Sequence, residues 1–204
     1  MRGDSRDKSQ SIYFNKILGT LKDEDNKPSK IDKLQRPYRV MDVANHIVEF
    51  FSVQERPITN LLLLKILYYL QAYYLVTNDE RLFKEDIEKW GYGPVEPIVY
   101  GYFKENGALP IKQPCPYMIN NSGSVEMVNP QEQKLDDTDS SKIEDIAMQL
   151  YKKYHSNPFE LVEITHAEPM WKNNENLIVN GYHNLKYTDK EIIEYFKTGE
   201  HWPW

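Results

Sequence analysis

The residue that comes nearest to a catalytic group is His166, in the string Thr165-His166-Ala167-Glu168. A carboxylate close to an imidazole can orient it for general acid–base catalysis, and Glu163 and Glu168 both lie within one helical turn of His166 in sequence. A histidine at a helix end more often bonds to the backbone or to a carboxylate for structural reasons. No second carboxylate-bearing motif accompanies His166, so the sequence predicts no catalytic residue.

Other motifs that carry enzyme chemistry do not occur in this sequence. The chain has no glycine-rich phosphate loop of the form GxxxxGK[ST] or GxGxxG, and no HExxH string. Its five histidines lack the spacing of metal ligands, and its single cysteine, Cys115, has no basic residue closer than Lys112 to activate the thiol. We therefore expect no metal, no cofactor and no enzymatic activity.

The most distinctive string is Trp90-Gly91-Tyr92-Gly93-Pro94-Val95. Glycines on both sides of a tyrosine allow the backbone to take a positive φ or to approach another segment closely, and proline fixes the entry into the next element. Two interpretations stay open. Either a rigid turn fills the core with its aromatic rings, or it displays Tyr92 at an interface, where Tyr and Trp often dominate binding. The second predicts Tyr92, Gly93 and Pro94 as partner-binding residues.

A second aromatic string, Glu168-Pro169-Met170-Trp171-Lys172, fits the same two interpretations. We predict Trp171 as a further partner-binding residue on this basis. The chain ends in His201-Trp202-Pro203-Trp204, and exposed tryptophans are costly to solvate. These terminal rings are expected either to fold back on the body or to contact a partner.

The composition narrows the class of protein. Hydrophobic residues make up 40% of the 204, enough for a core, and no run of about eighteen apolar residues is present to span a membrane. Residues 1–37 hold nine Lys or Arg against six Asp or Glu, a charge of +3. Because the whole chain has a net charge of −6, the remaining residues carry −9. An acidic body repels phosphate backbones, so nucleic acid is not expected as a partner. We expect a cytoplasmic protein without a membrane partner.

Residues 1–37 are expected to form an appendage to a domain that spans residues 38–204. Ile12, Phe14 and Leu18 belong to a short apolar stripe at helical spacing, which a polar linker follows at residues 22–30. The stripe fits a flexible tail with a nascent helix, or a helix that docks on the body or in a groove of a partner. The second alternative adds Ile12, Phe14 and Leu18 to the predicted binding residues.

Hydrophobic periodicity predicts the elements that must position these residues. Helices are expected at residues 42–53, 59–76, 95–106 and 141–154, with two more that start near 158 and 188. The helix at 59–76 is apolar on nearly all sides, which is typical of the centre of a bundle. Residues 117–128 alternate around a short polar loop and predict a β-hairpin. The predicted fold is mainly α, a single helical domain with a central apolar helix, one small β-hairpin and an N-terminal appendage.

Four predicted helix ends rest on specific residues. Asp42 is expected to cap the helix at 42–53, Ser141 and Thr188 are each followed three residues later by Glu, as in a capping box, and Gly107 provides a left-handed stop.

Taken in order, these strings resemble the motifs of the Panacea antitoxin domain, which is also called SocA-like or, in phages, GepA-like. The resemblance covers roughly residues 41–197. The matching segments are Val43–Ile47, Ile58–Leu61, Lys65–Leu75, Leu82–Phe83, Glu85–Trp90, Tyr92–Val95, Val99–Tyr100 and Leu161–Lys172. Two departures stand out: Leu61-Leu62-Leu63-Leu64 replaces a more polar family pattern, and Asn173-Asn174 replaces a pair that includes a basic residue.

The resemblance implies the antitoxin of a bacterial or phage toxin–antitoxin system, which neutralises a cognate toxin by direct protein–protein binding. Some family members are thought to hand the toxin to a protease, so the alternative is an adaptor that delivers a client to a protease system. A DNA-binding regulator is a third possibility, and the acidic body disfavours it.

Overall fold

A computed structural model describes residues 34–56, 58–121 and 123–204. The chain divides into two units, Met1–Lys30 and Ile31–Trp204, and every described residue belongs to the second. The predicted binding residues Ile12, Phe14 and Leu18 lie outside the described residues, and the predicted boundary between residues 37 and 38 stays a prediction.

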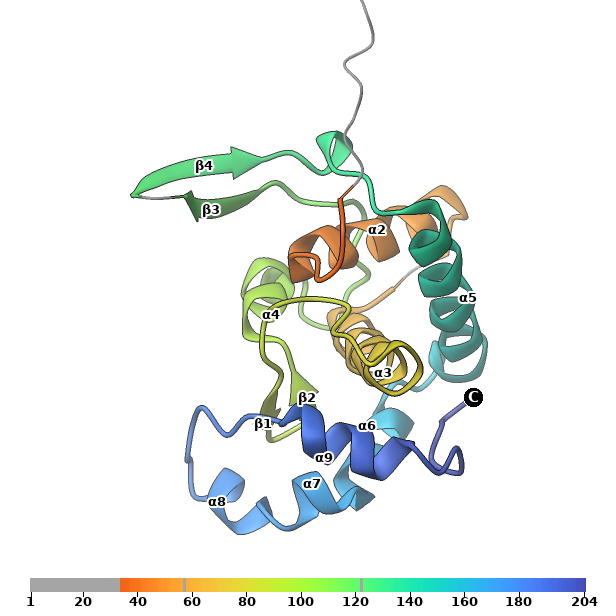
Figure 1. Cartoon of the computed structure of the whole chain (residues 1–204), viewed down its shortest axis with the longest axis vertical. Helices are drawn as coiled ribbons and strands as arrows, with labels where there is room; N and C mark the ends of the chain where they lie inside the picture. Colours follow the sequence, from red (N-terminus) through yellow and green to blue (C-terminus); the bar gives the residue numbers. More distant parts are fainter. Residues whose placement is uncertain (1–33, 57, 122) are drawn as a thin grey trace, which may run out of the picture. The chain divides into compact units, whose positions relative to one another are not determined.

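Helix α3 (Asn60–Asn78) is the centre of the fold, as predicted. The hydroxyl of Thr59 caps it by accepting a hydrogen bond from the Leu62 amide at 3.3 Å. Figure 1 shows α3 enclosed by helices that come from distant parts of the sequence. The surrounding helices are α2 (Val40–Val53), α4 (Pro97–Phe103), α5 (Asp137–Tyr154) and α9 (Asp189–Phe196). Because α3 packs on several sides, most residues along it are buried.

Two predicted helix starts are wrong. Helix α2 begins at Val40, two residues before Asp42, because the carboxylate of Glu85 accepts a hydrogen bond from the Val40 amide at 2.8 Å. Helix α5 begins at Asp137 rather than at Ser141, because Asp136 already accepts a hydrogen bond from the Thr138 amide at 2.9 Å.

The helix predicted at 95–106 is shorter. Glu96 caps α4 by accepting hydrogen bonds from the amides of Ile98 and Val99, which leaves Val95 in a strand. After Phe103 the chain tightens into a 3₁₀ turn, η1 (Lys104–Asn106), and Gly107 ends it with a φ of +56°, as predicted. The capping box of Thr188 and Glu191 at the start of α9 is confirmed.

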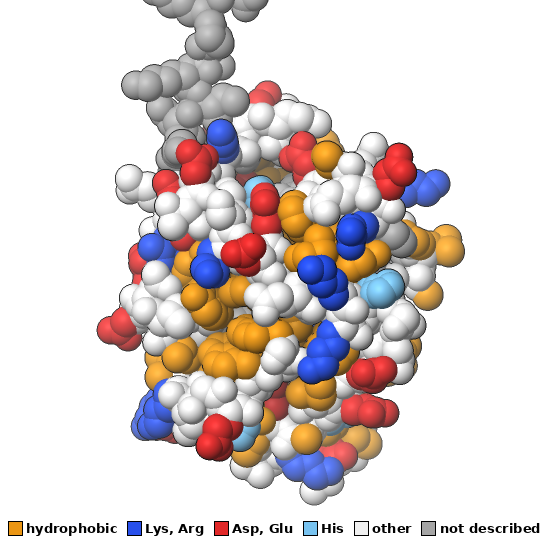
Figure 2. All heavy atoms as spheres, turned by 90° about the vertical axis from the view of Figure 1, so that its right-hand side faces the viewer, with side chains coloured by type: hydrophobic (Ala, Val, Ile, Leu, Met, Phe, Trp, Pro, Cys, Tyr) orange, Lys and Arg blue, Asp and Glu red, His pale blue; other side chains and the backbone are white. Residues whose placement is uncertain are grey.

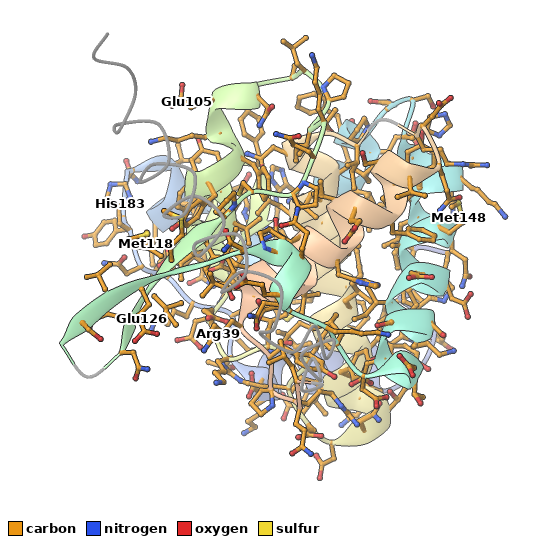
Figure 3. All side chains as sticks on the ribbon, turned by 90° about the horizontal axis from the view of Figure 1, so that it is seen from above. Arg39, Glu105, Met118, Glu126, Met148 and His183 are labelled. Atoms are coloured by element: carbon orange, nitrogen blue, oxygen red, sulfur yellow. The ribbon has the colours of Figure 1, made fainter. Side chains whose placement is uncertain are left out.

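Two antiparallel hairpins occur in the described chain, and the sequence predicted one. Strands β3 (Tyr117–Asn121) and β4 (Ser124–Val128) form the predicted hairpin, with Tyr117 opposite Val128. This arm reaches away from the helices and carries Met118 and Glu126 (Figures 1 and 3). The other hairpin pairs β1 (Glu88–Trp90) with β2 (Gly93–Val95), so the distinctive aromatic string forms a tight strand connection.

The C-terminal third completes the bundle with short helices. They are α6 (Phe159–Ala167), α7 (Pro169–Lys172) and α8 (Glu175–Val179), and the 3₁₀ turn η2 (Pro130–Glu132) lies earlier, before α5. The terminal aromatics fold back on the body, since Trp202 stacks on Phe196 with ring centroids 4.6 Å apart and Trp204 stacks on Trp202. Figure 2 shows hydrophobic side chains gathered on the face that carries α5 and this end of the chain.

The mainly helical fold class is confirmed. Among the described residues, no helix is both long enough and apolar enough to cross a bilayer.

Candidate functional site

The turn between β1 and β2 combines an exposed ring with a buried backbone. Tyr92 leaves 64% of its surface exposed, whereas Gly93 and Pro94 directly after it are buried. Gly93 has a φ of +86°, which glycine adopts at little cost. A β-carbon at this position would lie 2.7 Å from Nζ of Lys65 and closer still to Oγ1 of Thr165. The turn therefore requires glycine for both its backbone angle and its packing.

The buried side chain of Lys65 holds this turn in place. Its side chain is fully buried on α3, and Nζ donates hydrogen bonds to the carbonyl oxygens of Tyr92 and of Pro94, the second at 3.2 Å. Burial disfavours the charged amine and lowers the pKa of Lys65 to about 7. A buried amine is costly, and here it satisfies two carbonyls that the turn would otherwise leave without partners.

Glu168 is the second buried ionisable group beside Lys65. It is 1% exposed and accepts a hydrogen bond from the hydroxyl of Tyr68 at 2.5 Å. Burial raises the pKa of Glu168 to about 8, while the Tyr68 hydrogen bond and the nearby Lys65 oppose the rise. Neither Lys65 nor Glu168 lines a described surface cavity, so both groups act on the protein's own backbone and side chains in this arrangement.

Trp171 holds the same hairpin through a further hydrogen bond. Its indole Nε1–H donates a hydrogen bond to the carbonyl oxygen of Trp90 at 2.8 Å, and its ring is 3% exposed. The imidazole of His166 stacks on Trp171 with centroids 3.6 Å apart, and burial with the neighbouring Lys65 lowers the pKa of His166. The sequence left Trp171 open between a core plug and a binding anchor, and we predicted the anchor; the structure buries its ring.

The acid–base arrangement considered for His166 does not form. Glu168 bonds to Tyr68, and Nε2 of His166 is buried without a hydrogen-bond partner among the described residues. The His166 ring therefore serves as a packing surface for Trp171.

A surface cavity of about 430 Å³ opens beside Tyr92. The start of α3, the β1–β2 hairpin, α4 with the turn after it, and the start of α6 line this cavity. The ring of Tyr92 contacts Phe159 of α6 edge to face, with centroids 6.0 Å apart, and Phe159 is 54% exposed. We call this cavity and its rim the Tyr92 groove. Its side chains include those of Leu61, Trp90, Tyr92, Tyr100, Lys104 and Phe159.

Sequence reasoning missed most of the groove. Phe159 follows Pro158 in a strong helix-start signal, which favoured a purely structural interpretation. Tyr100 of α4 and Lys104 of η1 fall in the helix predicted at 95–106, but the prediction rested on its buried apolar residues, and these two line the groove instead. One sequence feature did point to the groove. Leu61-Leu62-Leu63-Leu64 is more apolar than the family pattern, and Leu61 and Leu64 both line the groove.

Most of the groove lining, together with Lys65, Glu168 and Trp171, lies within a region that matches a known family, and Thr59, Asn60 and Leu61 precede that region. The family described as "Antitoxin SocA-like, Panacea domain" matches residues 63–172, more than half of the chain. The chain belongs to this family, as its motifs predicted.

One curated relative is similar over a shorter stretch. The Antitoxin SocA of Caulobacter vibrioides (strain NA1000 / CB15N) is 38% identical over 65 residues, which is 32% of this chain and 35% of the relative. The chain thus spans about a third of the length of that relative. No solved structure matches the chain.

Proposed function

We propose that this protein is the antitoxin of a toxin–antitoxin pair, and that it neutralises a cognate toxin by direct binding through the Tyr92 groove. The observation that supports this most strongly is the contrast at the β1–β2 turn. The Tyr92 ring is largely exposed, while the backbone around it is held from beneath by Lys65 and Trp171.

Such a frame suits tight binding. A nanomolar complex needs about −12 kcal/mol, commonly supplied by a few aromatic or Arg anchors within an interface of roughly 1,600 Å². A turn already fixed in one conformation loses less entropy when it binds, so more of the contact energy appears as affinity. Tyr92 and Phe159 provide two adjacent exposed rings on this frame.

Co-expression with the product of the neighbouring reading frame tests the proposal. The toxin alone is expected to arrest growth, the antitoxin to restore it, and the two purified proteins to co-elute in size-exclusion chromatography. Growth arrest that the antitoxin does not relieve contradicts the proposal. Relief that requires a protease, with loss of the toxin in cells and no inhibition in vitro, favours the adaptor instead.

A further inference from the structure

The Tyr92 groove is apolar with a single cation at its edge. Its lining contains no Asp or Glu, and its one charged residue is Lys104, in the turn that follows α4. Lys104 forms no ion pair within the described part of the chain. Glu105 does not line the groove and lies near the outer end of this segment (Figure 3). An isolated cation beside an apolar depression complements an occupant that carries a carboxylate next to apolar side chains.

The floor of the groove also has an unsatisfied acceptor. Asn60 is 5% exposed and lines the groove, and its Oδ1 has no hydrogen-bond partner among the described residues. A buried acceptor without a donor is unfavourable, because it loses its hydrogen bond to water and gains none in the protein. This atom would be satisfied by an O–H or N–H group that entered with the occupant.

The neighbouring strands cannot accept an additional strand on their outer side. The outer edge of β1 is already occupied, because the Lys89 amide donates to the Leu185 carbonyl and the Tyr187 amide donates to the Ile87 carbonyl. On β2, the carbonyl of Pro94 is taken by Lys65. Pairing of an extended peptide with this hairpin is therefore blocked. A helix needs no such pairing, because it satisfies its own backbone and contacts a groove through its side chains.

The size of the groove fits two side chains rather than one. A volume of about 430 Å³ exceeds that of any single side chain. Residues three or four apart on a helix have Cβ atoms about 5–6 Å apart, so one helical turn presents two apolar side chains together.

We propose that the occupant of the Tyr92 groove is one turn of an amphipathic helix of the toxin, with two apolar side chains at i and i+3 or i+4 and an Asp or Glu that pairs with Lys104. One of the two apolar side chains is a Tyr or Trp, whose O–H or N–H donates to Oδ1 of Asn60. This inference rests on the proposed function, since it names the part of the toxin that the antitoxin recognises.

Two groove variants test the inference, each with a matched control. Ala108 is exposed and lines the groove, so Ala108→Trp places an indole in it, whereas Leu109→Trp adds the same ring at the next residue, 70% exposed and outside the lining. Lys104→Glu reverses the groove charge, and Lys152→Glu makes the same change on the exposed side of α5. The probe is the purified product of the neighbouring reading frame, measured by isothermal titration calorimetry.

We expect Ala108→Trp to weaken toxin binding at least 100-fold and Lys104→Glu about tenfold, while both control variants bind within twofold of the wild type. Overlapping peptides of the toxin should locate a single amphipathic segment, and replacement of its acidic residue by Lys should restore binding to Lys104→Glu. Toxin binding that both groove variants retain overturns this inference and the groove as the binding site, and leaves an antitoxin that binds its toxin through another surface. A wild-type protein that binds no toxin overturns both.

Discussion

The indole Nε1–H of Trp171 donates a hydrogen bond to the carbonyl oxygen of Trp90, 81 residues earlier in the chain, at 2.8 Å. This bond joins the two aromatic strings that stand out in the sequence. It ties α7 to the end of β1, in the same hairpin whose Tyr92 and Pro94 carbonyl oxygens accept hydrogen bonds from Lys65. The two strings therefore form one structural unit, in which Trp171 is the support and Tyr92 is the displayed ring.

Trp171→Phe tests this support. Phenylalanine keeps most of the buried ring but removes the donor, which leaves the Trp90 carbonyl without its partner. We expect the free energy of unfolding to fall by about 1–3 kcal/mol in urea denaturation. Trp204→Phe, at a ring that is 36% exposed, is the control and should change it by less than about 0.5 kcal/mol. Equal effects of the two substitutions would mean that the hydrogen bond contributes nothing.

Gly93→Ala should destabilise the protein more than an alanine at another left-handed glycine. A positive φ costs a non-glycine residue about 1–2 kcal/mol, and at Gly93 the new methyl group also collides with Thr165 and Lys65. Gly181 has a φ of +80° and open space around it, so Gly181→Ala carries only the backbone cost. We expect Gly93→Ala to lower the free energy of unfolding by at least about 2 kcal/mol more than Gly181→Ala. Similar losses would show that the close packing at Gly93 is unimportant.

Glu168 should make stability depend on pH. Its pKa is about 8 in the folded protein and near 4.5 in the unfolded chain, so the folded state binds more protons between these values. The free energy of unfolding therefore falls as the pH rises from about 4.5 towards 8. Well below pH 7, Lys65 is protonated in both states and adds no slope; it begins to lose its proton in the folded state only as the pH nears its pKa of about 7.

Glu168→Gln removes this titration, and the Gln side-chain carbonyl can still accept the Tyr68 hydrogen bond. Urea denaturation at pH 5 and pH 7 should show a larger loss of stability for the wild type than for the variant. The difference between the two proteins isolates Glu168 from other buried carboxyls such as Glu96, whose pKa burial also raises. An identical change in both proteins would contradict the assignment.

Lys65→Met should loosen the turn without unfolding the bundle. Methionine fills the space of the lysine stem but leaves the Tyr92 and Pro94 carbonyls without their donor. Hydrogen exchange followed by mass spectrometry should show faster exchange at residues 91–95. Exchange in α9 should be unchanged and serves as the internal reference. Unchanged protection at residues 91–95 would indicate that Lys65 does not hold the turn.

The sequence predicted the central helix and the family well, because both depend on local patterns. The apolar run in α3 and the order of the motifs can be read along the chain. Helix starts were less predictable where the cap comes from far away, as when Glu85 caps α2. The β1–β2 hairpin was missed because each strand has only three residues and no alternating pattern.

The candidate site was predicted in part. Tyr92 is exposed, but Gly93, Pro94 and Trp171 are buried around it, since a sequence cannot tell a supporting aromatic from a displayed one. Phe159 and Lys104 join Tyr92 only through the tertiary fold.

Titration of the toxin into wild-type and Tyr92→Ala antitoxin tests the central claim most directly. Tyr92 is exposed, so the variant should unfold at the same urea concentration as the wild type. We predict nanomolar binding for the wild type and a loss of at least tenfold for Tyr92→Ala, as for an aromatic anchor at the centre of an interface. Tyr182→Ala, at a comparably exposed ring outside the groove, should bind as tightly as the wild type. Equal affinity of all three proteins for the toxin would contradict the claim.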